Sequence, residues 1–530
     1  MRISLSTSLV FFGVLGGIQA QLSAQGVDWL SQTSGGQAGN AASTDPALSG
    51  DGQMVVFQSD ATNLVANDTN GVADIFFLDR STGIPVRVSL DTAGIQADGS
   101  SIRPEISSNG QFIVFRSDAT NLVANDTNAL TDIFVHDRIH GITTRVSVDS
   151  NGVESNGAST TCDISGDGRY VVFQSAGSNL VAADTNGEDD IFLHDRQTGT
   201  TTRVSVDSLG VEGDSFSKEA VISTDGSTIA FTSRASNLVA NDTNTQIDAF
   251  VHERVTGQTM RVSLKSGGAQ AFGNSEHPGL SADGSVVVFT SDSLSIVPGG
   301  RNGVEDVYTH DRNTAITKRV SVNSQGVAGV FWSWKGTISD DGRYVAFESY
   351  ATDLVTRDTN LMADVFLHDR TLEMTTNLSF SRSATQGNRG SANPSISSDG
   401  SIVIFDDFSA NLDAGDTNGV TDIFINDRNT YPNLRKYGTC PGPMKLAVTN
   451  LTPGGTIVYL YGDRGTYTHV GAHCNGLTLG IANPLIGGMR TADAAGEWSM
   501  SFVSQTGVHC WQSVQVVDIA TCVASNLLTL

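Results

Sequence analysis

Apolar and polar positions along most of the chain repeat with a period of 58 residues. Each copy contains two short apolar runs, and each run has an aromatic residue at a fixed place. The aromatic residue of the first run is Phe57, Phe115, Phe173, Phe231, Phe289, Phe347 or Phe405, and that of the second is Phe76, Phe134, Phe192, Phe250, Tyr308, Phe366 or Phe424. Such regular repetition indicates an array of equal units that bury their apolar faces against one another.

Each copy carries four strand signals separated by turn signals. In the second copy we predict strands over 104–107, 111–117, 132–138 and 144–149. An Asp-Gly or Asn-Gly pair before the second strand supplies the positive φ angles of a tight hairpin turn. Both faces of these strands are apolar or small, as sheets packed on both sides require. The sequence therefore predicts an all-β fold, a seven-bladed β-propeller of four-stranded blades.

The two ends of the repeat predict how the ring closes. The seventh copy has three strands and then leaves the pattern at Tyr431-Pro432. The segment Trp29–Ser34 precedes the first copy and aligns with a fourth strand. We expect this N-terminal strand to complete the last blade, because an open ring would leave strand edges exposed.

The Asp-Gly motif also carries a family resemblance. The stretch Leu48-Ser49-Gly50-Asp51-Gly52, followed by a Val-Val-Phe run that ends at Phe57, resembles the TolB-like propeller repeats of bacterial periplasmic and secreted proteins. The resemblance covers residues 27–430 and implies the blade type, but it says little about a ligand. The N-terminal α/β domain of TolB has no counterpart here, so its partner-binding role is not carried over.

The regions flanking the repeat suggest export and a further domain. A basic start at Arg2, an apolar run over 9–18 and small residues at Ala20 and Ala24 predict a signal peptide over 1–24. We expect the propeller over 25–436 and a small β-sandwich-like domain over 437–530. No later segment is apolar enough to span a bilayer. The expected location is the periplasm or the extracellular space.

Cysteine usage agrees with an oxidising compartment. Four of the five cysteines, Cys440, Cys474, Cys510 and Cys522, lie in the C-terminal domain. They allow three disulfide pairings. We favour Cys510–Cys522 together with Cys440–Cys474, and reduced thiols are the alternative. Cys162 is expected to be a small core residue.

The formal charge of −25 limits the partners. A polyanion is repelled by nucleic acid and by anionic membranes, so neither is an expected partner. A protein, a peptide or a glycan is expected instead.

A polar loop after the second strand of each copy is a candidate calcium site. Its first copy reads Asp68-Thr69-Asn70-Gly71-Val72-Ala73-Asp74, with oxygen side chains at positions 1, 3 and 7, as in calcium loops. Alternatively, these side chains shape the turn without metal. Gly300 and Arg301 break the fifth copy, which should bind no ion. The candidate ligands are Asp68, Asn70, Asp74, Asp126, Asn128, Asp132, Asp184, Asn186, Asp190, Asp242, Asn244, Asp248, Asp358, Asn360, Asp364, Asp416, Asn418 and Asp422.

The candidate binding site lies where the repeat is broken. The position entering the first strand is a different residue in every copy, and the position two places on also varies. Both should line one mouth of the central channel, although drift at a solvated position would give the same variation. The candidate ligand-binding residues are Asp45, Arg103, Glu105, Asp163, Glu219, His277, Lys335 and Asn393.

Three functions are compatible with these patterns. An exported, non-catalytic binding module is favoured, because the copies contain no insertion large enough to build a walled active site and show no nucleophile motif. The first alternative is a propeller hydrolase or lyase using acidic residues at the channel mouth. The second alternative is a structural cell-surface protein. Five histidines at one repeat position, from His136 to His368, are expected to form hydrogen bonds between blades.

Overall fold

The computed structural model describes residues 27–298, 303–355, 358–381 and 385–428 in full and, from Asn433 to Thr529, the strands alone. Contacts divide the chain into one compact unit of Gln25–Asn429 and a second that contains Thr430–Leu530. The predicted signal peptide and the four C-terminal cysteines lie outside the described residues. No helix in the described part is long and apolar enough to cross a membrane.

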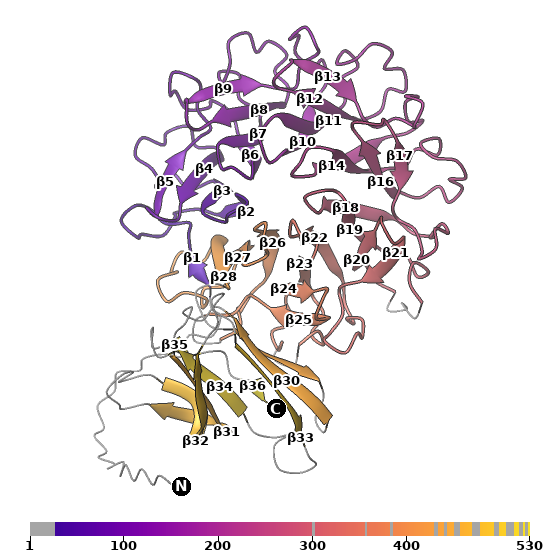
Figure 1. Ribbon diagram of the computed structural model, residues 1–530. Coiled ribbons are helices and arrows are strands. Elements are labelled where there is room, and N and C mark those ends of the chain that lie inside the picture. The colour runs from indigo at the N-terminus through magenta and orange to yellow at the C-terminus, as the bar shows by residue number, and fades with distance from the viewer. Residues whose placement is uncertain are drawn as a thin grey trace, which may run out of the picture. The chain divides into compact units, whose positions relative to one another are not determined.

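The first unit is a ring of seven four-stranded antiparallel sheets, which confirms the predicted seven-bladed propeller (Figure 1). The first strand of each blade lies nearest the axis and the fourth lies at the rim. Blades 1 to 3 consist of β2 (Ser43–Leu48), β3 (Met54–Ser59), β4 (Asp74–Asp79) and β5 (Ile84–Arg87); β6 (Ser101–Ile106), β7 (Phe112–Ser117), β8 (Asp132–Asp137) and β9 (Ile142–Arg145); and β10 (Ser159–Ile164), β11 (Tyr170–Ser175), β12 (Asp190–Asp195) and β13 (Thr200–Arg203). Blades 4 to 6 consist of β14 (Ser217–Ile222), β15 (Thr228–Ser233), β16 (Asp248–Glu253) and β17 (Thr259–Arg261); β18 (Ser275–Leu280), β19 (Val286–Ser291), β20 (Asp306–Asp311) and β21 (Ile316–Arg319); and β22 (Ser333–Ile338), β23 (Tyr344–Ser349), β24 (Asp364–Asp369) and β25 (Met374–Asn377). Blade 7 consists of β26 (Ser391–Ile396), β27 (Ile402–Asp407), β28 (Asp422–Asp427) and β1 (Asp28–Trp29).

The ring closes through the N-terminal strand, as predicted. Strand β1 pairs antiparallel with β28, with Asp28 opposite Ile425 and Trp29 opposite Phe424. The backbone N–H of Leu30 donates to the carbonyl of Ile423 at 2.8 Å. Strands far apart in the sequence therefore share one sheet, and β1 covers part of the outer edge of β28.

The predicted bounds of the fourth strand are wrong. In blade 2 the strand covers Ile142–Arg145 rather than 144–149, and β1 likewise ends at Trp29. The chain then turns, because the Ser147 hydroxyl accepts a hydrogen bond from the backbone N–H of Ile133, a group that a longer strand would pair differently. The Val146 N–H still donates to the Ile133 carbonyl at 2.9 Å, and beyond it Val148 forms a bridge with Glu154 of the same connection rather than with β8.

The aromatic positions of the repeat form the centre of each described blade. Phe115 and Phe134 are fully buried, and their rings stack at 6.1 Å. The same pair recurs with centroid separations of 5.8 to 6.0 Å in blades 1 and 3 to 6. Successive side chains of a strand point to opposite faces, so each blade presents an apolar surface to both neighbours. Burial between blades therefore holds the ring together.

The Asp-Gly turns join the first and second strands under a close steric limit. Gly168 has φ +75°, and a Cβ there would lie 2.0 Å from Cδ2 of Phe112 in the preceding blade. Only glycine combines that conformation with so close an approach. The repeated glycine thus serves both the turn and the packing between blades.

The second unit contains two antiparallel sheets and is β-rich, as expected. One sheet has the order β29-β30-β33, and the other has β32-β31-β34-β35 with β36 paired to β34. The strands are β29 (Asn433–Gly438), β30 (Gly442–Thr449), β31 (Thr456–Thr468), β32 (Thr478–Thr491), β33 (Trp498–Ser504), β34 (Ser513–Asp518), β35 (Val523–Ala524) and β36 (Leu528–Thr529).

Candidate binding site

A β-bulge interrupts the innermost strand of every blade at the most variable position of the repeat. In blade 2 the register with β7 shifts between Ile102 and Glu105, which places Arg103 in the bulge. Six of the seven residues at this position have φ between 49° and 54°, a left-handed conformation that is uncommon outside glycine: Asp45, Arg103, Glu219, His277, Lys335 and Asn393. A bulge redirects a side chain, and here it directs a polar one to the axis.

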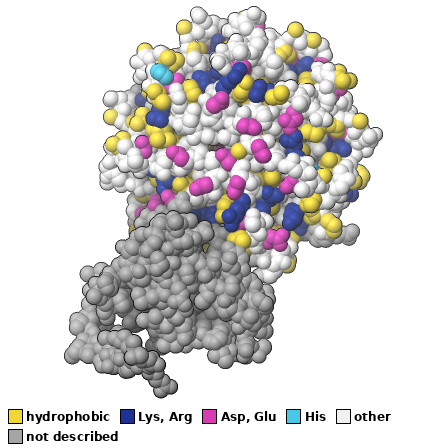
Figure 2. All heavy atoms as spheres, viewed as in Figure 1, with side chains coloured by type: hydrophobic (Ala, Val, Ile, Leu, Met, Phe, Trp, Pro, Cys, Tyr) yellow, Lys and Arg dark blue, Asp and Glu magenta, His cyan; other side chains and the backbone are white. Residues whose placement is uncertain are grey.

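All eight candidate ligand-binding residues line one cavity on the axis, of about 550 Å³. A ring of aliphatic residues lies beyond them along the same strands: Leu48, Ile106, Ile164, Ile222, Leu280, Ile338 and Ile396. Figure 2 shows acidic side chains gathered around the centre of the ring. A few polar groups on an apolar wall, in a cavity of this size, are typical of ligand pockets. The structure thus brings together the predicted residues, while their role in binding stays a prediction.

The channel is narrowest at the Asp-Gly turns. There, backbone hydrogen bonds link each blade to the next in a closed circuit, from Gly50 N–H donating to Ser108 at 3.0 Å to Ser398 N–H donating to Gly50 at 2.9 Å. The Thr224 hydroxyl donates to Asp340 at 3.0 Å, although these residues belong to blades 4 and 6. Side chains two blades apart are thus in contact at these turns, where the inner strands converge. A ligand would therefore enter from the opposite face, which carries the long loops.

One arc of the pocket is acidic. Asp45, Glu105 and Asp163 come from blades 1, 2 and 3 and face the channel. Burial and the nearby Asp163 and Asp45 carboxylates raise the pKa of Glu105 well above its ordinary value. Burial also raises the pKa of Asp163 to about 6, although that carboxylate accepts backbone hydrogen bonds from Ile164 and Ile222. A protonated acid in this arc can donate a hydrogen bond to a ligand.

The opposite arc combines cationic and neutral donors. The Lys335 ammonium donates to Oδ1 of Asn393 at 2.6 Å. The backbone N–H of His277 donates to Glu219 at 2.9 Å, and its ring Nε2 lies 3.9 Å from the same carboxylate. The other ring nitrogen, Nδ1, is buried without a hydrogen-bond partner among the described residues. This arc can therefore offer both donors and an acceptor.

Sequence reasoning missed a set of residues on the second strands that hold the bulges. Oε1 of Gln58 accepts the backbone N–H of Arg103 at 2.8 Å, so a blade 1 side chain fixes a blade 2 bulge. Asp406 does the same for Asp45, at 3.1 Å, and burial raises the pKa of Asp406 to about 7. The signal was available, because this position also varies: Gln58, Arg116, Gln174, Thr232, Thr290, Glu348 and Asp406.

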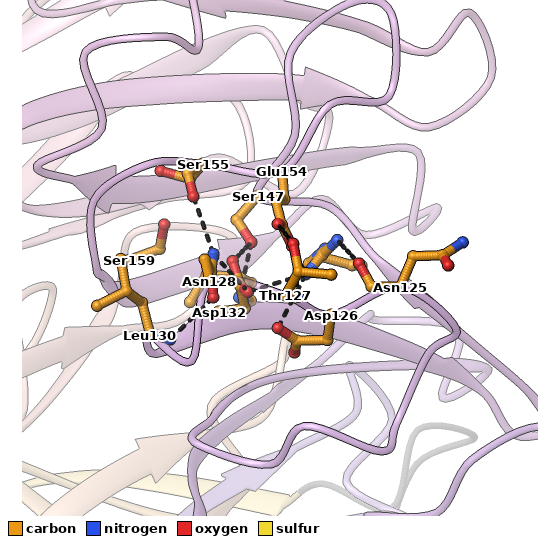
Figure 3. A network of polar contacts seen from close by, with 12 residues as sticks. Asn125, Asp126, Thr127, Asn128, Leu130, Asp132, Ser147, Glu154, Ser155 and Ser159 are labelled. Atoms are coloured by element: carbon orange, nitrogen blue, oxygen red, sulfur yellow. Dashed lines mark hydrogen bonds and ion pairs between the residues drawn. The ribbon is translucent and has the colours of Figure 1, made fainter.

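The three candidate metal ligands of the blade 2 loop, Asp126, Asn128 and Asp132, lie close together (Figure 3), but both aspartates form ion pairs with an arginine. Asp132 is fully buried; its Oδ1 accepts the Ser147 hydroxyl at 2.5 Å and its Oδ2 accepts Asn128 at 3.3 Å. Nη1 of Arg145 lies 3.1 Å from Asp132, 3.4 Å from Asp126 and 2.8 Å from Glu154. The guanidinium thus supplies the positive charge that the carboxylates need.

The same arrangement recurs in blades 1, 3 and 4, around Arg87, Arg203 and Arg261. One trio of carboxylates in the described part has its oxygen atoms within 4.8 Å of one another: Asp184, Asp190 and Glu212. Arg203 forms an ion pair with all three, at 3.6, 3.0 and 2.6 Å. In blade 5 the altered residues Gly300 and Arg301 lie outside the described residues, and Arg319 pairs with Asp306 at 3.3 Å. Calcium at these loops stays a prediction.

The expected hydrogen bonds from the repeated histidines to a neighbouring blade are not observed: each histidine bonds a threonine of its own blade, and that threonine makes the link to the preceding blade. Nδ1 of His136 lies 2.9 Å from the Thr143 hydroxyl, which donates to the Leu90 carbonyl of the preceding blade at 2.5 Å. The threonine proton is used in that bond, so the histidine must be the donor to the threonine oxygen. Burial lowers the pKa of His136, which keeps the ring neutral.

No family model and no curated protein matches this chain. Among solved structures, TolB from Acinetobacter baumannii is 18% identical with a TM-score of 0.34, and the match covers 57% of this chain and 59% of that one. A putative TolB from Agrobacterium tumefaciens is 15% identical with a TM-score of 0.35, covering 65% and 93%. An acylaminoacyl peptidase is 11% identical with a TM-score of 0.44, covering 77% and 58%. TolB structures are among the matches, which confirms the resemblance predicted from the Asp-Gly repeat, and at these values the likeness extends to the propeller fold alone.

Proposed function

We propose that the protein is an exported, non-catalytic binding module whose ligand, a short peptide, a glycan or a segment of a protein, enters the central channel. One observation carries the proposal. The repeat keeps its architectural positions in every copy, whereas the position in the bulge differs in all seven and lines a single pocket. A site assembled from one distinct side chain per blade has the asymmetry that recognition of a defined ligand needs.

The pocket chemistry favours a polar ligand. Asp45, Glu105 and Asp163 offer acceptors on one side, while Lys335 and the free Nδ1 of His277 offer a donor and an adaptable nitrogen on the other. Peptides and glycans both present closely spaced donors and acceptors that suit such a wall. The predicted signal segment supports a location outside the cytoplasm, where either ligand class occurs.

Arrays of peptides and of glycans test the proposal, followed by calorimetry with the probe that binds best. Arg103→Glu and Lys335→Glu, both at exposed bulge positions, should lower affinity at least tenfold and leave the melting temperature nearly unchanged. Lys318→Glu, on the outer strand β21, is the matched control and should bind like the wild type. Equal affinity in all four proteins would exclude the channel as the binding site.

The raised pKa of Glu105 favours a second candidate, a hydrolase or lyase in which this residue acts as general acid. Cleavage of a bound probe that disappears in Glu105→Gln while binding persists would identify that activity. Binding without turnover would support the binding module.

A further inference from the structure

The loop of blade 7, between β27 and β28, retains the repeated carboxylates but lacks the arginine. Asp416 and Asp422 correspond to the paired aspartates of the other blades. The position that is arginine in blades 1 to 5 is Trp29, from the closing strand. The position that is glutamine or glutamate in blades 1 to 4 and 6 is Ala38. Both side chains that could neutralise or bridge the aspartates are therefore replaced.

Blade 7 also gains carboxylates at this place. Asp407 stands where the other six copies have serine, and Asp413 stands where they have valine. The ionised Asp416 is repelled by Asp422 and by Asp413, and Asp407 is repelled by Asp416. Among the described residues, no lysine, arginine or histidine forms an ion pair with any of the four. The local charge is thus strongly negative and uncompensated.

Asp416 is a buried carboxylate without a hydrogen-bond partner among the described residues. Its side chain is 4% exposed, and neither carboxylate oxygen accepts a hydrogen bond of normal geometry from the described residues, although the backbone N–H of Asn418 lies near. A buried charge without a partner is costly, so native structures rarely leave one. In blade 2, by contrast, the corresponding Asp126 lies beside Arg145.

Blade 6 shows what replaces the arginine when no ion is needed. Asn377 holds the arginine position there, and the Gln386 amide donates to Asp358 at 2.8 Å and to Asp364 at 2.7 Å. A neutral amide therefore bridges that pair of aspartates. Blade 7 has alanine in place of this glutamine, and no side-chain amide among the described residues donates to both Asp416 and Asp422.

We propose that the loop of blade 7 binds one Ca²⁺, with Asp416 and Asp422 as ligands, and that the ion stabilises the closure of the ring. Carboxylates are hard oxygen ligands that suit Ca²⁺, and the carboxylate of Asp413, in the same cluster, is a further candidate ligand. The described part of the loop offers no imidazole or thiolate that would favour zinc.

The ligands are hydrogen-bonded to both ends of the propeller. Oδ1 of Asp422 accepts the Ser31 hydroxyl at 2.6 Å, and Ser31 in turn accepts the indole N–H of Trp29 at 2.9 Å. The Asn418 amide donates to the Gly39 carbonyl at 3.0 Å and to Asp422 at 2.9 Å. An ion held by this loop therefore favours the closed ring, because the N-terminal segment must be in place to complete the site.

Calorimetry and thermal unfolding of the chelator-treated full chain test the proposal with CaCl₂ as the probe. We expect uptake of one ion per chain rather than the six that the sequence pattern predicts, because an arginine in blades 1 to 4 and Gln386 in blade 6 already contact the corresponding aspartates. The melting temperature should rise with the logarithm of calcium concentration. MgCl₂ should reproduce the rise poorly, since Mg²⁺ gives up its water reluctantly. Asp416→Asn should abolish uptake and the calcium-dependent rise, yet melt no lower than the calcium-free wild type, because the charge it removes has no partner. Asp184→Asn, the same change beside Arg203 in blade 3, should keep both responses.

Terbium luminescence locates the ion without relying on the stability of Asp416→Asn. Tb³⁺ bound in this loop would be excited through the Trp29 indole, so Trp29→Phe should retain calcium uptake but lose most of the sensitised emission. No calcium uptake by the wild type would overturn the proposal. Uptake that survives Asp416→Asn, or that is lost equally in Asp184→Asn, would place the ion elsewhere and overturn it as well.

Discussion

Trp29 provides a direct test of how much the closing strand contributes to stability. Its side chain is 7% exposed and packs in a cluster with Val27, Leu412 and Phe424. Truncating a large buried aromatic residue to alanine costs about 3–5 kcal/mol, since the cavity is only partly refilled. With an unfolding entropy of about 2 cal/mol/K per residue over roughly 400 residues, this corresponds to a melting temperature lower by about 4–6 °C.

The assay is thermal unfolding followed by circular dichroism, with a chelator present so that bound metal does not contribute. Trp332→Ala is the control, because that side chain is 48% exposed and its loss should change stability by less than about 0.5 kcal/mol. Hydrogen exchange of the amides in β28 gives a second, local measurement, and these amides should lose protection in Trp29→Ala. If Trp29→Ala has the same melting temperature as Trp332→Ala and its β28 amides stay protected, the closing strand does not stabilise the closed ring.

Two further predictions concern turns and pH. Gly168→Ala should lower the free energy of unfolding by about 3 kcal/mol or more, because the new Cβ would overlap Phe112. Gly187 also has a positive φ but open space around it, so Gly187→Ala should cost about 1 kcal/mol. Similar urea midpoints for the two variants would show that the overlap is easily relieved. Burial lowers the pKa of His368 to about 4, below the ordinary value of about 6.5, so the unfolded chain binds a proton first and stability should fall by up to about 3 kcal/mol as the pH drops from 6.5 towards 4. His368→Gln should flatten that part of the curve in urea unfolding at several pH values, and an unchanged slope would mean that this ring is not kept neutral by burial.

The repeat made the blades predictable, because Phe115 and its equivalents recur at a constant spacing that only equal packed units explain. The closing strand was predictable for the same reason, since Trp29–Ser34 has no place in the ring except beside the last copy. The channel residues were predicted from their variation. The bulge at Arg103 was not, because the Arg103 N–H donates a hydrogen bond to Gln58 of the neighbouring blade, a contact that one copy of the repeat does not reveal.

The arginine at the centre of the polar loops was missed for a comparable reason. Arg145 is 13 residues from Asp132 and lies on a strand of alternating exposure, where a cation is ordinarily solvated. The overlooked signal is that the arginine is replaced in the last two copies, by Asn377 in blade 6 and by Trp29 in blade 7. A departure from the repeat in the last two copies was as informative as the motif itself.

The position of the ring closure has a consequence for the order of folding. Ser31 and its partner Asp422 are separated by 391 residues. The N-terminal segment leaves the ribosome first but must wait, unpaired, until the last copy has been synthesised. The first six blades need only local contacts, whereas the seventh requires a contact of very high sequence separation, which is entropically slow to form. Ring closure is therefore expected to be the last and rate-limiting step, and a chain that stalls before it exposes the edge of β28 to another molecule.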